Sequence, residues 1–224
     1  MSNHNRILRL LLLAFCLVPS FSFAHPIIKE GGFSAGLAHP ALGFDHFLAM
    51  LSVGLLSVQL GGRAIWTVPA TFVFFVLIGG VMGMHDIPLF TVEAGIATSV
   101  LVLGLAIAAD RRIPVLIAMV GVAVFGLFHG HAHGTEMPGF VHPAAYASGF
   151  VLGTALIHLL GVGLGLVATR HRVGTLTLRF CGALVAILGV NFLVTAIREP
   201  KPQRTVAQIL TCPDCGKIHT AVKN

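Results

Sequence analysis

The sequence predicts an all-α, polytopic membrane protein with a bundle of six transmembrane helices, and three observations lead to this prediction. The 224-residue chain is 56% hydrophobic and only 10% charged, whereas soluble domains carry roughly 25% charged residues. Its mean hydropathy is +0.92. Six apolar segments follow the N-terminal region, each near the roughly 20 residues that a spanning helix needs. Lipid must therefore solvate most of this chain.

The first 24 residues have the three parts of a secretory signal peptide. Arg6 and Arg9 form a basic region, residues 10–18 an apolar region, and residues 22–24 (SFA) a small-x-small cleavage site. The apolar region is too short to span a bilayer, so we expect cleavage after Ala24; an uncleaved anchor is the alternative. The mature N-terminus is then expected in the periplasm.

Residues 25–197 are expected to form the membrane domain. Its helices are predicted at about 33–60, 64–84, 89–109, 113–133, 143–168 and 176–197. The first segment is too long for one simple span and contains Pro40, so we expect its outer part to be broken or interfacial. Residues 198–224 form a polar C-terminal tail.

Positive charge in the loops predicts the orientation of the bundle, because lysine and arginine favour the cytoplasmic side. The loops predicted inside hold six arginines, and the two predicted outside hold neither lysine nor arginine. The six are Arg63, Arg111, Arg112, Arg170, Arg172 and Arg179. An even number of helices then places the tail outside, although the tail itself is basic. An odd number of helices is the alternative.

Polar side chains gather near the outer ends of these predicted helices. At a rise of 1.5 Å per residue, residues 129–136 lie at the outer end of the fourth helix. The first helix carries His39, Asp45 and His46 at or just below the same surface. By the same count, two residues of other helices fall in the outer third and one lies deeper. These are Glu93 and Asn191, and the deeper His158.

Helical spacing then groups these residues by face. His129, His133 and Glu136 occupy positions i, i+4 and i+7, which share one side of a helix. His131 points away from them in an unbroken helix, although the glycines on either side would loosen that turn. In the first segment the histidines at 39 and 46 are seven apart and share a face. Asp45, one step round, is placed to orient an imidazole.

Imidazole and carboxylate groups in this arrangement indicate a divalent metal path. They are ligands of borderline first-row cations such as Ni²⁺, Co²⁺, Zn²⁺ and Cu²⁺, and inside a membrane they mark substrate paths or proton relays. The other interpretation is that single histidines at helix ends only reach the headgroup region. We apply that second interpretation to His85, His142 and His171.

Two motifs connect the sequence with a family. The stretch HPALGFDH (residues 39–46) has the form H-x5-D-H, and FHGHAHGTE (residues 128–136) has the form F-H-G-x-x-H-G-x-E. In this order they resemble the HupE/UreJ family of bacterial nickel and cobalt permeases, and the resemblance covers about 25–197. It implies uptake of Ni²⁺ or Co²⁺ across the bacterial inner membrane, supplying enzymes such as hydrogenase or urease. The metal residues that it implies are His39, Asp45, His46, His129, His133 and Glu136.

A secondary carrier is the function expected, with the metal ion as substrate and no resident cofactor. The sequence has no G-x-x-x-x-G-K-[ST] loop for a nucleotide and no H-E-x-x-H motif, and no serine or cysteine stands beside the motif histidines. Divalent metal efflux and an intramembrane metalloenzyme are the alternatives. Further residues on the translocation path are predicted to be Glu93, His131, His158 and Asn191.

The expected partners follow from the same reasoning. They are a divalent cation and the lipid bilayer; the arginines form no basic face for nucleic acid. The resemblance adds metallochaperones or maturation proteins of nickel enzymes. In the tail, CPDCGKIH places Cys212, Cys215 and His219 at a spacing typical of half a zinc site. A disulfide between the two cysteines and a metal-capturing tail are both open.

Overall fold

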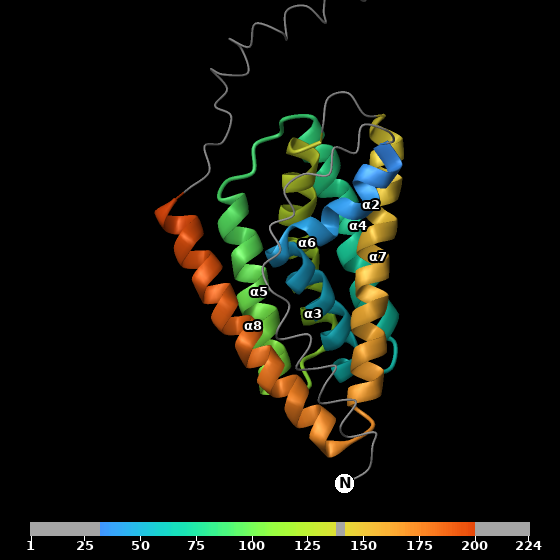
Figure 1. Ribbon diagram of the computed structural model, residues 1–224, viewed down its shortest axis with the longest axis vertical. Coiled ribbons are helices and arrows are strands. Elements are labelled where there is room, and N and C mark those ends of the chain that lie inside the picture. Colours follow the sequence, from blue (N-terminus) through green and yellow to red (C-terminus); the bar gives the residue numbers. More distant parts are fainter. Residues whose placement is uncertain (1–31, 138–141, 200–224) are drawn as a thin grey trace, which may run out of the picture.

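The computed structural model describes residues 32–137 and 142–199, and within these ranges the chain contains helices and no strand (Figure 1). The predicted signal peptide and the tail with Cys212, Cys215 and His219 lie outside the described residues. The helices are α2 (Gly32–Leu42), α3 (Phe44–Leu60), α4 (Ala64–Met84), α5 (Val92–Ala109), α6 (Val115–Thr135), α7 (Pro143–Ala168) and α8 (Arg172–Arg198).

The prediction of an all-α membrane protein with six spans is confirmed. Helices α4 to α8 are each long and apolar enough to cross a membrane, and α2 with α3 passes the same test as one segment bent by 82°. Both bounds of α4 and α7 coincide with the predicted ones, and those of α5, α6 and α8 differ by a few residues. Hydropathy therefore located every span.

The expected break in the first segment falls at Gly43, between α2 and α3. Pro40 lies inside α2 and cannot donate an N–H to the helix, and the helix ends two residues later at Leu42. A Cβ atom on Gly43 would lie 2.9 Å from Nδ1 of His46. Glycine therefore leaves room for the His46 ring beside the turn.

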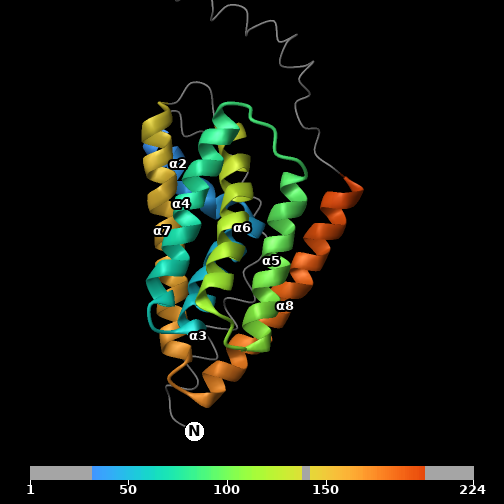
Figure 2. The ribbon, with the colours of Figure 1, turned by 180° about the vertical axis from the view of Figure 1, so that it is seen from behind.

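Helix α3 is the centre of the bundle. Its residues from Leu48 to Val58 are all buried, and it contacts α4, α5 and α7. Around it α4 packs along α6, α5 along α8, and α7 along α2. Figures 1 and 2 show α8 at the edge of the molecule, beside α5, and α2 across one end.

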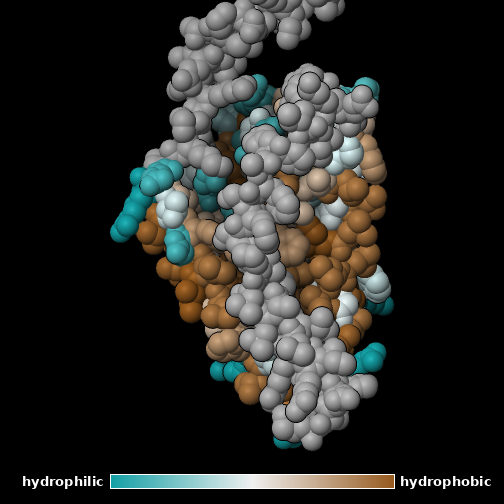
Figure 3. All heavy atoms as spheres, in the orientation of Figure 1, coloured by the Kyte–Doolittle hydropathy of each residue, from teal (hydrophilic) through white to brown (hydrophobic). Residues whose placement is uncertain are grey.

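The surface has the polarity of a membrane protein. Large apolar side chains such as Leu116, Phe180 and Ile187 are exposed on α6 and α8. Among the residues coloured in Figure 3, hydrophobic ones cover the sides, and hydrophilic ones lie mostly toward the two ends. Lipid tails would cover such an apolar surface without the cost that water imposes.

Candidate metal site

Four histidines from three helices pack ring against ring near one end of the bundle. The centroid of the His133 ring lies 4.7 Å from that of His39 and 4.5 Å from that of His46. The His46 ring in turn lies 4.7 Å from His129. The broken helix pair α2–α3 and the end of α6, far apart in the sequence, therefore meet here. We call these four histidines, with Asp45 and Glu136, the histidine cluster.

One end of the histidine cluster opens to the surface. Nε2 of His39 lies 3.4 Å from Oε2 of Glu136, with 25% and 46% of the two side chains exposed. Potential ligand atoms of His39, His133 and Glu136 all lie within 4.8 Å of one another. Ligands held at about 2.0–2.2 Å from one first-row ion are at most about 4.4 Å apart. A small rotation of these side chains would therefore bring all three onto one ion.

Asp45 fixes the orientation of the His46 ring. Its Oδ1 lies 2.8 Å from both the backbone N and Nδ1 of His46. A carboxylate has no proton to give, so the backbone N–H and Nδ1–H of His46 donate to it. This leaves Nε2 of His46 as the basic nitrogen, and that atom is buried without a hydrogen-bond partner among the described residues.

Ser99 of α5 fixes the orientation of the His129 ring. Its hydroxyl donates to the carbonyl oxygen of Ile96 at 2.6 Å and lies 2.9 Å from Nε2 of His129. A hydroxyl has a single proton, so Ser99 accepts a hydrogen bond from Nε2–H of His129. The basic nitrogen of His129 is then Nδ1, which is buried and has no partner in the described part of the chain.

His133 stands at the middle of the cluster with both ring nitrogens buried and without a partner among the described residues. A buried polar atom left unsatisfied costs about 1–3 kcal/mol, and native proteins satisfy most of them. The histidine cluster contains four such nitrogens, one on His46, one on His129 and two on His133. A cation bound among these rings would satisfy the one basic nitrogen of each of these three imidazoles.

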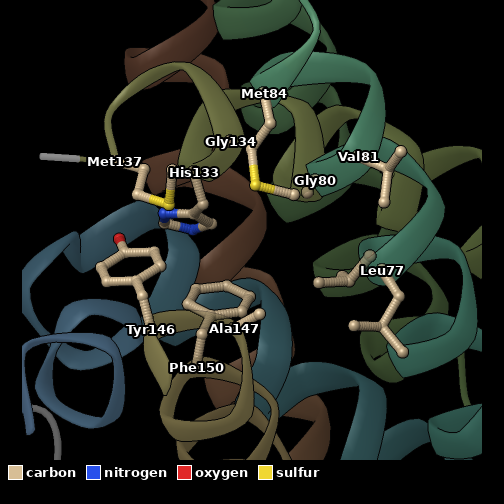
Figure 4. Close-up of a pocket in the computed structure, with 12 residues that line it drawn as sticks. Leu77, Gly80, Val81, Met84, His133, Gly134, Met137, Tyr146, Ala147 and Phe150 are labelled. Atoms are coloured by element: carbon tan, nitrogen blue, oxygen red, sulfur yellow. The ribbon is translucent and has the colours of Figure 1, made fainter. Parts of the chain in front are cut away.

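An apolar pocket of about 80 Å³ lies on the other side of His133, between α4, α6 and α7. Figure 4 shows Met137, Tyr146 and Phe150 close to the His133 ring, with Leu77 and Val81 across the pocket. The ring centroids of His133 and Phe150 are 4.3 Å apart. Apart from His133 and Tyr146, its lining residues are apolar, and apolar cavities stay dry. The more polar and more exposed side of the cluster is therefore the end formed by His39 and Glu136.

The region of the chain that matches known proteins includes every residue of the histidine cluster. The chain matches the family described as HupE / UreJ protein over residues 13–192. It belongs to the HupE/UreJ family. This HupE/UreJ chain is 41% identical over 182 residues to the protein named "Protein HupE" of Rhizobium leguminosarum bv. viciae, a match that covers 81% of the chain and 95% of that relative. No solved structure matches it.

The structure of this HupE/UreJ protein places the four other predicted path residues outside the histidine cluster. His131 is buried, but its Nε2 donates to the carbonyl of Ile87 in the α4–α5 connection at 2.8 Å, so it points away from the cluster. Asn191 is exposed on the peripheral helix α8, and the structure does not bring it to the cluster. Glu93 lies half-buried in the first turn of α5. His158 is buried in α7, deeper in the bundle.

Four residues near the histidines of this HupE/UreJ protein were not identified from the sequence. Ser99 lies beside His129. The other three are Phe72, whose ring centroid lies 5.4 Å from that of His129, Phe150, 4.3 Å from the His133 ring, and Tyr146, 5.8 Å from the His39 ring. Tyr146 is the one tyrosine of the sequence, and its buried hydroxyl has no partner within the described ranges. The rarity of tyrosine in this sequence is the signal that could have identified Tyr146. Serines and phenylalanines of apolar helices carry no comparable one.

Proposed function

We propose that this HupE/UreJ protein is a secondary transporter that carries Ni²⁺, with Co²⁺ as a second cargo, across the bacterial inner membrane into the cytoplasm. The observation that carries the proposal is the set of buried imidazole nitrogens without partners among the described residues, flanked by two carboxylates, where α2, α3 and α6 meet. In the proposed orientation the mature N-terminus and the histidine cluster face the periplasm.

The donor atoms of the cluster favour first-row transition metals. Imidazole suits Ni²⁺, Co²⁺, Zn²⁺ and Cu²⁺, whereas Mg²⁺ and Ca²⁺ prefer sites built from oxygen atoms alone. Four imidazoles with only two carboxylates therefore select against the abundant hard cations. Among these metals, the family resemblance supports nickel and cobalt as the proposed cargo.

The membrane potential is sufficient to drive the proposed uptake. Moving one charge through about 100 mV releases about 2.3 kcal/mol, so a dication gains about 4.6 kcal/mol, enough for roughly 10³-fold accumulation. Binding at the cluster must remain modest, because an ion that is held too tightly cannot leave. The half-exposed pair His39 and Glu136 provides an open side from which the ion exchanges.

The hydrogen bonds of Ser99 favour transport over hydrolysis. In a serine nucleophile the hydroxyl donates its proton to the histidine base. Here the proton of Ser99 goes to the carbonyl of Ile96, and His129 is the donor to Ser99. With its proton on the carbonyl of Ile96, this serine orients an imidazole, which supports the transport proposal.

Accumulation of ⁶³Ni²⁺ in bacterial cells tests the proposal and its direction. Cells that express the full chain are expected to accumulate more ⁶³Ni²⁺ than cells with an empty vector, and collapse of the membrane potential should remove the difference. Unlabelled Co²⁺ should compete, whereas a large excess of Mg²⁺ should not. Lower accumulation than in the empty-vector cells would indicate efflux, and equal accumulation would contradict nickel transport.

A further inference from the structure

A second group of unpartnered polar atoms lies deeper in the bundle, on α7. His158 is 2% exposed, and both of its ring nitrogens lack a hydrogen-bond partner in the part of the chain that the structure describes. One helical turn earlier, Thr154 is fully buried and its hydroxyl also lacks a partner there. Residues four apart lie on the same face of a helix. Three unsatisfied atoms are therefore together near the middle of a spanning helix.

The free hydroxyl of Thr154 departs from the behaviour of other threonines in this protein. Thr71, Thr169 and Thr177 each donate to the carbonyl oxygen four residues earlier, at 2.7–2.8 Å, which is the usual way to satisfy a helical threonine. Thr154 makes no such bond. Its oxygen is therefore available to another ligand.

The ring of Phe72 connects this deeper pair to the histidine cluster. Phe72 is fully buried in α4, and its ring centroid lies 5.4 Å from that of His129 and 5.2 Å from that of His158. The succession of ring contacts that begins at His39 thus continues through Phe72 to His158. A single phenyl ring therefore separates the donor atoms of the histidine cluster from those of His158 and Thr154.

We propose that His158 and Thr154 form a second, inner position for the same divalent cation, which the ion occupies after it leaves the histidine cluster and passes Phe72. This inference rests on the proposed function. A charge near the centre of a bilayer is costly, and ions pass most readily between several positions of modest affinity. A ring nitrogen and a hydroxyl oxygen supply two protein ligands there, and the ring of Phe72 lies between the two positions.

The alternative is a histidine buried only to fill space, and it makes a different prediction about stability. A buried imidazole with two unsatisfied nitrogens destabilises the fold, so its replacement by an apolar side chain of similar size should leave stability unchanged or raise it. For a space-filling residue, that replacement would also leave metal binding and transport unchanged. For the inner position, it would remove one of the two bound ions and reduce transport while the fold remains.

Equilibrium dialysis with ⁶³Ni²⁺ on the purified full-length chain, combined with uptake into proteoliposomes, tests the inner position. We expect wild type to bind two Ni²⁺ ions and His158→Leu to bind one, with a thermal unfolding temperature at or above that of wild type. Uptake by His158→Leu should fall by about tenfold, equivalent to about 1.4 kcal/mol on the barrier. Thr154→Val should show a smaller loss. The matched control, His171→Leu, changes an exposed histidine and should behave as wild type.

Retention of two bound ions, or of wild-type uptake, in His158→Leu would overturn the inner position and leave the proposed function standing. Absence of nickel uptake by the wild-type protein would overturn the proposed function, and this inference with it. Should His158→Leu fail to fold, His158→Phe retains a planar ring and takes its place in both assays, with the same expected results.

Discussion

Replacement of His133 by alanine is expected to abolish nickel uptake without unfolding the protein. His133 touches the rings of both His39 and His46, so it joins the α2 and α3 parts of the cluster. Residues that only orient a metal ligand change affinity or activity by 10–100-fold, so loss of this central donor should reduce ⁶³Ni²⁺ uptake by at least about 100-fold. Its ring nitrogens make no hydrogen bond to the described residues, so little fold stability depends on them.

The same substitution at two exposed histidines provides the control for His133→Ala. His85 and His142 are exposed at the ends of α4 and α7, and their alanine variants should transport as wild type does. Circular dichroism should show wild-type helix content in all three variants. More than half of wild-type uptake in a folded His133→Ala protein would rule out the cluster as the cation's binding site.

Substitution of Gly130 by alanine is expected to disrupt the pairing of α4 with α6. A Cβ atom at Gly130 would lie under 3.0 Å from backbone atoms of Val76 and Gly80 in α4. Backbone atoms cannot rotate away, so the two helices must separate at the turn that carries His129. Overpacking of this kind costs about 1–3 kcal/mol and occasionally more. The purified variant should unfold at a markedly lower temperature and bind Ni²⁺ more weakly.

Gly121 of the same helix is the matched control for Gly130. A Cβ atom there would meet nothing within 4 Å, and alanine favours the helix by about 1 kcal/mol over glycine. Gly121→Ala should therefore unfold at the wild-type temperature or above it. Equal unfolding temperatures for Gly130→Ala and Gly121→Ala would show that α4 and α6 are not in close backbone contact.

The fold was accessible from the sequence because its signals are local. A run of about 20 apolar residues identifies a span regardless of what it packs against, and the bounds of α4 and α7 follow from it. The break before α3 was accessible only in part, since Pro40 weakens the helix that contains it, but Pro69 lies inside α4 without ending it. The packing of α4 on α6 depends on contacts between distant segments, and hydropathy holds no information about those.

The histidine cluster was predictable in part. Helical spacing correctly placed His129 and His133 on one face, and His131 points away from it, as an unbroken α6 requires. The predicted depth of a residue in the membrane was a weaker guide to whether it belongs to the cluster. It grouped Asn191 with the cluster, but depth does not say which way a side chain faces, and Asn191 is exposed on the peripheral helix α8.

Residues that orient the imidazoles show where sequence reasoning ends. Asp45 could be suspected because it adjoins His46 in the chain, and its carboxylate does bind that ring. Ser99 is 30 positions from His129, and only the packing of α5 against α6 brings the two together. A serine in an apolar helix normally satisfies itself on its own backbone, as Ser57 does with the carbonyl of Gly54. Nothing in the sequence distinguishes these two serines.

X-ray absorption spectroscopy of the purified protein loaded with Ni²⁺ tests most directly whether two distant segments supply ligands to one ion. We expect scattering from several imidazole rings around the nickel, with a lower imidazole count in His46→Ala, from α3, and separately in His133→Ala, from α6. A nickel surrounded by oxygen ligands alone, or one whose imidazole count is the same in wild type and both variants, would contradict the account.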